Sequence, residues 1–381
     1  MRNANHSVDQ ICDELRRAKS VDASEAYVMP SSYYTSEKFF EFEKENLFRK
    51  EWVCLGRTGE IPKKGDYFTT ELIGEPLLVC RDSTERVRVL SNVCRHRGNI
   101  IASGAGNSSR FTCSYHAWTY KNDGQLVGAP LMESVKNFDK ANCRLPEFSC
   151  EIWQGFIYVN LDGKAKPLAP RLDALMPHIK NYDLQDRTYV YGVEEIWQTN
   201  WKCLTENFME GYHLDFTHPT TLKPITPTKL CKKLPAGEGY NAYISGYDPN
   251  TPGRGPYPPN LTEEEQRYSM MFGIFPCHVV GLAPNNCVYL CLRPVSADSV
   301  AVKWGICSVL EEPGEDVVQN YVELMQKINS EDKAKLETLQ RGLKSRTVAQ
   351  GPLGPHDLEG TIWDMYLYMA GHLVNDQAVG S

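Results

Sequence analysis

The chain of 381 residues lacks several features that mark common protein classes. It has no run of about 18 apolar residues, so we expect no membrane-spanning helix. The formal net charge is −7 and no basic stripe is available to contact phosphates, which argues against a nucleic-acid partner. The first twenty residues contain no apolar segment of the kind found in secretory signals. We therefore expect a cytoplasmic protein.

Cysteine, in contrast, is abundant, with 13 residues. Because the chain is long and is not expected to be exported, we predict that most of these thiols are reduced. Only Cys94 and Cys113 belong to a motif. Seven others stand in apolar stretches and are predicted to be small buried residues: Cys54, Cys80, Cys203, Cys277, Cys287, Cys291 and Cys307.

The motif consists of two short peptides, Cys94-Arg-His96 and Cys113-Ser-Tyr-His116. Two thiolates and two imidazoles in this order can hold a [2Fe-2S] cluster, with cysteine on one iron and histidine on the other. A structural zinc site is the alternative, but zinc fingers group Cys with Cys and His with His. The flanking residues give CRHRG and CSYHAW, which closely resemble the two boxes of a Rieske domain. Trp118 is predicted to pack over a cluster loop.

The length suits two domains. Residues 1–45 show helical spacing of apolar residues, and residues 46–165 contain short strands and turns, including a hairpin around Asn122-Asp-Gly124. A Pro-containing stretch at 167–170 marks the boundary to a second domain, 166–381. There the pattern predicts a helix over Cys203–Tyr212, long antiparallel strands over Val279–Leu292 and Ser299–Leu310, and a helix over Val317–Leu343. The fold class is therefore α+β.

A second candidate metal site lies within the predicted helix region. His213 and His218 are five residues apart, which leaves them about 140° out of alignment on an ideal helix. Pro219 ends the helix, so His218 can turn back toward His213. Non-haem iron(II) oxygenases need two histidines and one carboxylate on one face. Asp215, between the histidines, is predicted to point away toward solvent.

The order of these motifs resembles the catalytic (α) subunit of the Rieske non-haem iron oxygenases over nearly the whole chain. This resemblance implies an N-terminal all-β Rieske domain with the ligands Cys94, His96, Cys113 and His116. It also implies a helix-grip-like catalytic domain, against which residues 1–45 pack. In the family the third iron ligand is an Asp that begins a late helix before a Q-R-G-L turn, which matches Asp332. Glu331 is its nearest rival.

Glu210 stands three residues before His213, where the family carries an acidic residue that links the iron to a Rieske histidine of the adjacent subunit. The resemblance thus implies contact between Glu210 and His116 of a neighbour, and a ring, expected to be a homotrimer. Most members have Asp at this position, whereas Glu occurs in carnitine and glycine betaine monooxygenases. A surface glutamate is the alternative. Asn207 is predicted either to order water near the iron or to support the helix.

We therefore expect a terminal oxygenase that contains a Rieske cluster and a mononuclear iron(II), and that uses O2 on a small molecule. Gly104-Ala-Gly106 lacks the strand–turn–helix context of a nucleotide site, so electrons should come from a separate NAD(P)H-dependent reductase. The substrate is either a quaternary or N-methyl amine, favoured by Glu210, or an aromatic acid or aryl ether, for which Arg293 would bind the carboxylate. The pocket is expected on the sheet around Phe272–Leu292. An electron-transfer ferredoxin and a zinc-stabilised module are alternatives from other classes.

Overall fold

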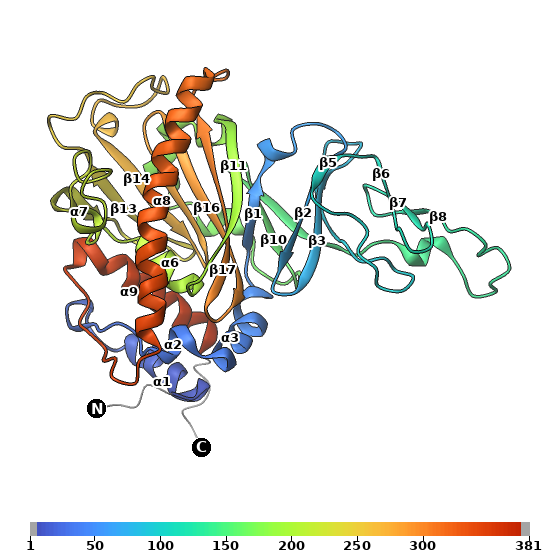
Figure 1. Ribbon diagram of the computed structural model, residues 1–381, viewed down its shortest axis with the longest axis horizontal. Coiled ribbons are helices and arrows are strands. Elements are labelled where there is room, and N and C mark those ends of the chain that lie inside the picture. The colour runs from blue at the N-terminus through green and yellow to red at the C-terminus, as the bar shows by residue number, and fades with distance from the viewer. Residues whose placement is uncertain (1–5, 375–381) are drawn as a thin grey trace. The chain divides into compact units, whose positions relative to one another are not determined.

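The computed structural model describes residues 6–374 and divides into two compact units (Figure 1). The β unit comprises Cys54–Ala165, and the α+β unit comprises Met1–Val53 together with Lys166–Ser381. Among the described residues, no helix is both long enough and apolar enough to cross a membrane.

The β unit is built from two antiparallel sheets, as expected for short segments separated by turns. The larger sheet has the order β1-β10-β9-β4-β3-β2-β5, and a small sheet has the order β6-β7-β8. The predicted hairpin is present between β7 and β8, where Gly124 has a φ of 88°. The strands are β1 (Val53–Arg57), β2 (Asp66–Leu72), β3 (Glu75–Arg81), β4 (Val87–Ser91), β5 (Ala105–Asn107), β6 (Arg110–Thr112), β7 (Thr119–Lys121), β8 (Leu126–Gly128), β9 (Glu147–Trp153) and β10 (Phe156–Asn160).

The α+β unit is built around one antiparallel sheet with the order β11-β17-β16-β15-β14-β13-β12. Its strands are β11 (Thr188–Trp197), β12 (Cys231–Lys233), β13 (Tyr240–Gly246), β14 (Tyr268–Ile274), β15 (His278–Leu282), β16 (Asn286–Ser296) and β17 (Ser299–Ser308). Its helices are α1 (Val8–Ala18), α2 (Ser32–Thr35), α3 (Glu37–Glu43), α4 (Leu168–Arg171), α5 (Met176–Ile179), α6 (Trp201–Phe208), α7 (Leu214–Thr217), α8 (Glu315–Leu343) and α9 (His356–Leu373).

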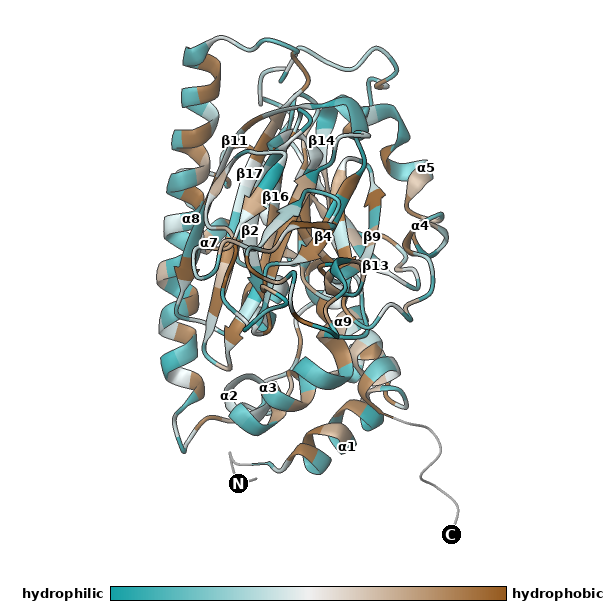
Figure 2. Cartoon of the chain, turned by 90° about the vertical axis from the view of Figure 1, so that its right-hand side faces the viewer, coloured by the Kyte–Doolittle hydropathy of each residue, from teal (hydrophilic) through white to brown (hydrophobic). Residues whose placement is uncertain are grey.

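Three helices pack on this sheet. Helix α6 packs against β15 and β16, helix α8 packs against β11, and helix α9 packs against β12 and β13. Helix α8 presents a buried stripe that includes Ile328, Asp332, Leu336 and Gln340, spaced four residues apart. Figure 2 shows this helix striped in hydrophilic and hydrophobic colours, as expected for a helix with one face on a sheet. Asp332 thus lies in the middle of the helix, on its buried side, and not at its start.

The prediction of one strand over Val279–Leu292 is wrong. The segment forms a hairpin, in which β15 and β16 pair in antiparallel register and Val280 lies opposite Tyr289. Pro284 and Asn285 lie in the connecting turn. Both residues are common in turns, and Pro cannot donate a ladder hydrogen bond inside a central strand. The predicted strand over Ser299–Leu310 and the predicted long helix are confirmed as β17 and α8.

The candidate metal centres

The two cysteine–histidine peptides of the β unit form loops with the same backbone hydrogen bonds. The Gly98 N–H donates to the Cys94 carbonyl at 3.0 Å, and the Ala117 N–H donates to the Cys113 carbonyl at 3.0 Å. The N–H groups of both cysteines donate to carbonyls five residues later, on Asn99 and Trp118. Gly98 and Ala117 both have a positive φ, of 78° and 58°. The sequence therefore folds into two equivalent tight turns, each starting at a cysteine.

These turns bring four potential ligands to one end of the β unit. Cys94 and Cys113 are buried, at 3% and 2% exposure, while His116 is exposed and its ring centroid lies 4.6 Å from that of His96. As predicted, Trp118 packs on this loop, stacking on His96 at 4.8 Å.

The polar environment of the cysteines and His96 fits a bound [2Fe-2S] cluster. Burial opposes ionisation of Cys113, but hydrogen bonds, first from the Tyr115 N–H, lower the pKa of its thiol overall. The thiolate is the form that binds metal. In addition, the buried Nδ1 of His96 has no hydrogen-bond partner among the described residues, which suits a nitrogen that binds metal.

In the α+β unit, His213, His218 and Asp332 lie together. One side-chain ligand atom from each lies within 4.8 Å of the others. The Nε2 of His218 is 3.0 Å from Asp332 Oδ1, and the Nε2 of His213 is 3.7 Å from the same oxygen. Two imidazoles and a carboxylate at these separations form the donor set of a non-haem iron(II) site.

An interruption of the helix between α6 and α7 brings His213 and His218 together. The predicted helix Cys203–Tyr212 is wrong at its C-terminal end, because α6 stops at Phe208. The Glu210 carboxylate then accepts hydrogen bonds from the Tyr212 and His213 N–H groups, which lie just before the following short helix. His213 and His218 flank this helix, α7, at its two ends. They do not project from one continuous helix.

Further polar side chains contact His213, His218 and Asp332. The Glu210 carboxylate hydrogen-bonds the Nδ1 of His213, and Glu331 Oε2 lies 2.7 Å from the Nδ1 of His218. The Thr221 hydroxyl donates to the same Glu331 oxygen at 2.6 Å. The Asn207 amide donates to Asp332 Oδ1 at 3.1 Å. Glu331 thus lies at the outer nitrogen of His218, while Asp332 lies at the inner nitrogens of both histidines.

These carboxylates also shift the pKa of His218. Burial alone would lower the pKa of His218, but the hydrogen bond and charge of Asp332, followed by those of Glu331, raise it overall. The surroundings of the triad therefore favour positive charge.

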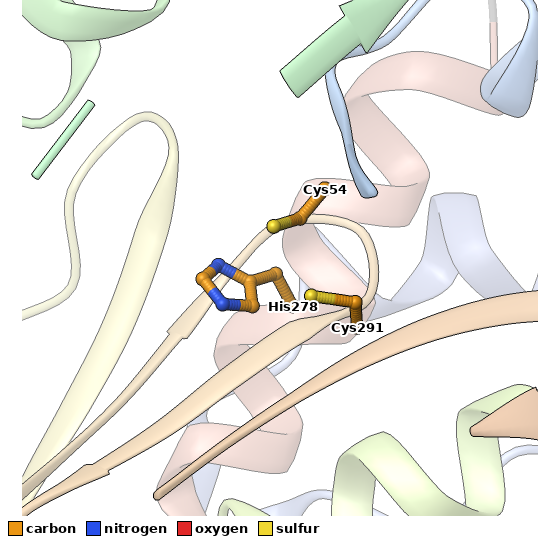
Figure 3. Close-up of side chains that lie close together, drawn as sticks. All are labelled: Cys54, His278 and Cys291. Atoms are coloured by element: carbon orange, nitrogen blue, oxygen red, sulfur yellow. The ribbon is translucent and has the colours of Figure 1, made fainter. Parts of the chain in front are cut away.

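Other predicted residues lie elsewhere. Asp215, expected to face solvent, is half-buried and accepts a hydrogen bond from the Thr228 N–H at 2.9 Å. His278 is buried on β15 opposite Cys291 of β16, as Figure 3 shows, and not at the triad. The seven cysteines predicted to be buried are all buried.

Sequence reasoning missed Thr221, Tyr34 and Tyr366. Thr221 follows His218 by three residues, and this spacing was its only signal in the sequence. No local pattern marks Tyr34 or Tyr366, because the Tyr34 hydroxyl contacts Glu206 of α6, and the Tyr366 hydroxyl contacts Tyr34, only in the folded structure.

Comparison with known proteins places these two sites in a family. Residues 178–373 match the family model of the ring hydroxylating alpha subunit (catalytic domain), and residues 51–139 match the Rieske [2Fe-2S] domain. The carnitine monooxygenase oxygenase subunit of Acinetobacter baumannii is 31% identical over 332 residues, which cover 84% of this chain and 86% of that protein. The glycine betaine monooxygenase oxygenase subunit of Pseudomonas aeruginosa is 31% identical over 201 residues, covering 52% of this chain and 47% of that protein.

Solved structures of Rieske oxygenases are similar to this chain in fold. The quaternary ammonium Rieske monooxygenase CntA in complex with L-carnitine superposes with a TM-score of 0.81 and 26% identity, covering 97% of this chain and 99% of that chain. Naphthalene 1,2-dioxygenase from Rhodococcus sp. shares the fold, with a TM-score of 0.82 and 20% identity over 98% of this chain and 100% of that chain. Since half of the chain matches the catalytic domain and a Rieske domain precedes it, the chain belongs to the α subunits of the Rieske oxygenases, oxidoreductases with a Rieske [2Fe-2S] cluster and a mononuclear iron.

Proposed function

We propose that the chain is the terminal oxygenase of a multicomponent system that hydroxylates or demethylates a quaternary or N-methyl amine. The observation that supports this proposal is the negative charge around His213, His218 and Asp332. Asp332, Glu331 and Glu210 bring three carboxylates to a site that a ferrous ion would occupy with two positive charges. Among the described residues, the ion pairs of these carboxylates involve only His213 and His218, with no lysine or arginine. Such surroundings favour a cationic substrate over an anionic one.

Arg293, the residue expected to bind an aromatic acid, lies on the face of the sheet opposite to helix α8. Lys333 of α8 lies 3.5 Å from Glu195, so Glu195 points toward α8. Side chains alternate along a strand, so the adjacent Glu194 points to the opposite face. Arg293 forms an ion pair with Glu194 and is 4% exposed. The arginine is therefore engaged away from Asp332, and this supports the amine over the aromatic acid.

The roles of the site residues follow from their contacts. His213, His218 and Asp332 would hold the mononuclear iron, which supplies binding and activation of O2 when bound. Glu210 and Glu331 fix the orientation of the two imidazoles through Nδ1, leaving Nε2 of each toward the metal. Asn207 holds the Asp332 carboxylate by its Oδ1.

Cys94 and Cys113 would bind one iron of the cluster, and His96 and His116 the other. Electrons would arrive singly from a separate reductase, and Glu210 would pass them on from His116 of a neighbouring subunit. A cytoplasmic homotrimer with a catabolic role completes the proposal. The relatives named as carnitine and glycine betaine monooxygenase oxygenase subunits support the amine substrate class.

Oxygen uptake tests the substrate class. With a reductase and NAD(P)H, we expect uptake coupled to product formation with carnitine, glycine betaine or proline betaine, and none with benzoate-type acids. Iron content and cluster absorption should be measured on the same sample. Coupled uptake with the aromatic acids alone, lost in Arg293→Ala, would overturn the amine assignment and favour the acid.

A further inference from the structure

The side-chain amide of Asn99 joins the two cysteine–histidine loops of the β unit. Asn99 follows the first loop directly, and its carbonyl accepts the Cys94 N–H at 2.8 Å. Its side chain reaches the second loop, where Nδ2 donates to Cys113 Sγ at 3.6 Å and to Ser114 Oγ at 3.4 Å. The same nitrogen donates to the Ile100 carbonyl at 2.9 Å. A residue of the first loop therefore contacts the cysteine sulfur of the second loop.

The acceptors around this amide fix its orientation and the use of its hydrogens. A carbonyl and a metal-binding thiolate can only accept, so the Asn99 nitrogen, with its two hydrogens, must face Ile100 and Cys113. One hydrogen is directed at the Ile100 carbonyl, and the other is shared between Cys113 and Ser114. Ser114 is exposed, so water can replace the amide as its partner, whereas Cys113 is 2% exposed. The sulfur is therefore the acceptor that depends more on Asn99.

The sulfur of Cys94 also has a side-chain neighbour with a hydrogen to donate. The Tyr120 hydroxyl lies 3.4 Å from Cys94 Sγ, and the Arg95 N–H donates to the same hydroxyl oxygen at 3.0 Å. A thiolate that binds metal carries no proton, so the hydroxyl is the donor of this pair. Both cysteines of the cluster thus receive a hydrogen bond from a side chain, and Asn99 supplies the bond to Cys113.

Hydrogen bonds to ligand sulfurs change the electron affinity of an iron–sulfur cluster. Reduction adds one electron, and the sulfur ligands carry part of the added negative charge. A donor at the sulfur stabilises this charge, so it favours the reduced form and raises the reduction potential. We propose that Asn99 raises the potential of the Rieske cluster through its hydrogen bond to Cys113. The proposal holds for any substrate, because the potential is measured without one.

Redox titration of the full oxygenase tests the role of Asn99. Dithionite supplies the electron through mediators, and the paramagnetic resonance signal of the reduced cluster is the readout. We expect Asn99→Ala to weaken the electron affinity of the cluster roughly tenfold, a fall in potential of about 59 mV for a one-electron couple. Asn99→Asp should lower it further at neutral pH, because a carboxylate cannot donate and adds negative charge. Wild-type potentials in both variants, at wild-type cluster content, would overturn the proposal.

Two further variants separate the sulfur contact from the other contacts of Asn99. Ser114→Ala removes the competing acceptor and leaves the amide hydrogen to the sulfur of Cys113, so the potential should not fall. If Ser114→Ala lowers the potential as much as Asn99→Ala, the contact with Ser114 carries the effect and the proposal is wrong. Tyr120→Phe provides the comparison at Cys94. A fall in potential after Tyr120→Phe with none after Asn99→Ala would also contradict the role of Asn99.

Isotope labelling tests the contact in the unaltered protein. In protein labelled with ¹⁵N at the side-chain amides of asparagine, the reduced cluster should show a hyperfine coupling to ¹⁵N, because the Asn99 nitrogen lies against a ligand sulfur. The coupling should be absent from labelled Asn99→Ala. A wild-type spectrum without this coupling, or a coupling that persists in Asn99→Ala, would show that the amide does not bind the sulfur of the cluster.

Discussion

Glu331 and Asp332 are adjacent acidic residues with different surroundings. Asp332 lies on the buried stripe of α8, where its oxygen approaches the Nε2 atoms of both histidines. Glu331 lies beside that stripe and contacts the Nδ1 of His218 and the Thr221 hydroxyl. Both carboxylates lie close to a histidine, but Asp332 approaches Nε2 atoms whereas Glu331 contacts Nδ1.

This difference predicts different effects on metal binding. Asp332→Asn should lose the mononuclear iron and all turnover, because it removes the charge of one ligand. Glu331→Gln should keep three ligands but bind Fe(II) roughly 10–100-fold more weakly, because an amide holds His218 less firmly. Competition with a chelator measures both, and the unchanged absorption of the Rieske cluster serves as the internal control. If Glu331→Gln abolishes the site and Asp332→Asn does not, the ligand is Glu331.

Among helices and strands, those predicted well from the sequence have a strong periodicity of apolar residues. The long helix α8 and the strand β17 agree with their predicted ranges because long apolar patterns specify them. The break between α6 and α7 was not predicted, because α6 ends where the Glu210 side chain binds the next N–H groups, and no periodicity records such a contact. The turn between β15 and β16 was missed although Pro284 and Asn285 signalled it.

The candidate site was predictable for residues that belong to motifs, and not for residues that reach it through tertiary packing. His213, His218 and Asp332 stand in recognisable patterns, so they could be chosen from the sequence. Tyr34 and Tyr366 are more than 300 residues apart in the chain and share a hydrogen bond that only the fold creates. The substrate pocket on the sheet around Phe272–Leu292 stays a prediction.

Helices α3 and α6 are joined by a buried ion pair whose loss should destabilise the protein. Lys202 and Glu43 are both fully buried, their charged atoms lie 2.6 Å apart, and the Lys202 ammonium lies 4.5 Å from the centre of the Tyr33 ring. Lys202→Met leaves the carboxylate of Glu43 buried without its cation. This should lower the free energy of unfolding by about 3–5 kcal/mol.

Denaturant unfolding of the metal-loaded protein measures this loss. The exposed pair of Arg49 and Glu45, at 3.0 Å, provides the control, because Arg49→Ala should cost less than about 1 kcal/mol. Combining Lys202→Met with Glu43→Leu should recover much of the stability, since neither partner then leaves a buried charge. A single variant as stable as the wild type would show that the ion pair does not hold the N-terminal helices in place.

At the scale of the whole molecule, the two sites belong to different units, and the proposed function requires electrons to pass between them. The resemblance assigns this exchange to Glu210 and to His116 of an adjacent subunit. Within one chain, Glu210 is buried at 7% exposure and bound to His213, while His116 is exposed on the β unit. An exposed imidazole is available to a neighbouring chain, which supports the proposed assembly.

Glu210→Gln tests this exchange. The variant should retain both metals but turn over far more slowly, because it removes the carboxylate that we propose to link the two sites. In a single turnover the reduced cluster should fail to reoxidise as product forms, while sedimentation should show the same oligomeric state as the wild type. Glu210→Asp, which keeps the charge on a shorter arm, should retain part of the rate. Normal reoxidation in Glu210→Gln would mean that Glu210 only orients His213.

The burial of the remaining thiols has a consequence for the working life of the enzyme. Oxidation of cysteine proceeds through its thiolate and needs an exposed sulfur. Burial raises the pKa of Cys80 and Cys150 to about 12 and that of Cys231 to about 11, and it also raises those of Cys203 and Cys277. At neutral pH these thiols stay protonated, and all of them except the half-buried Cys150 lie in the interior. These buried cysteines are thus a chemically quiet part of the core, protected from oxidants in solution.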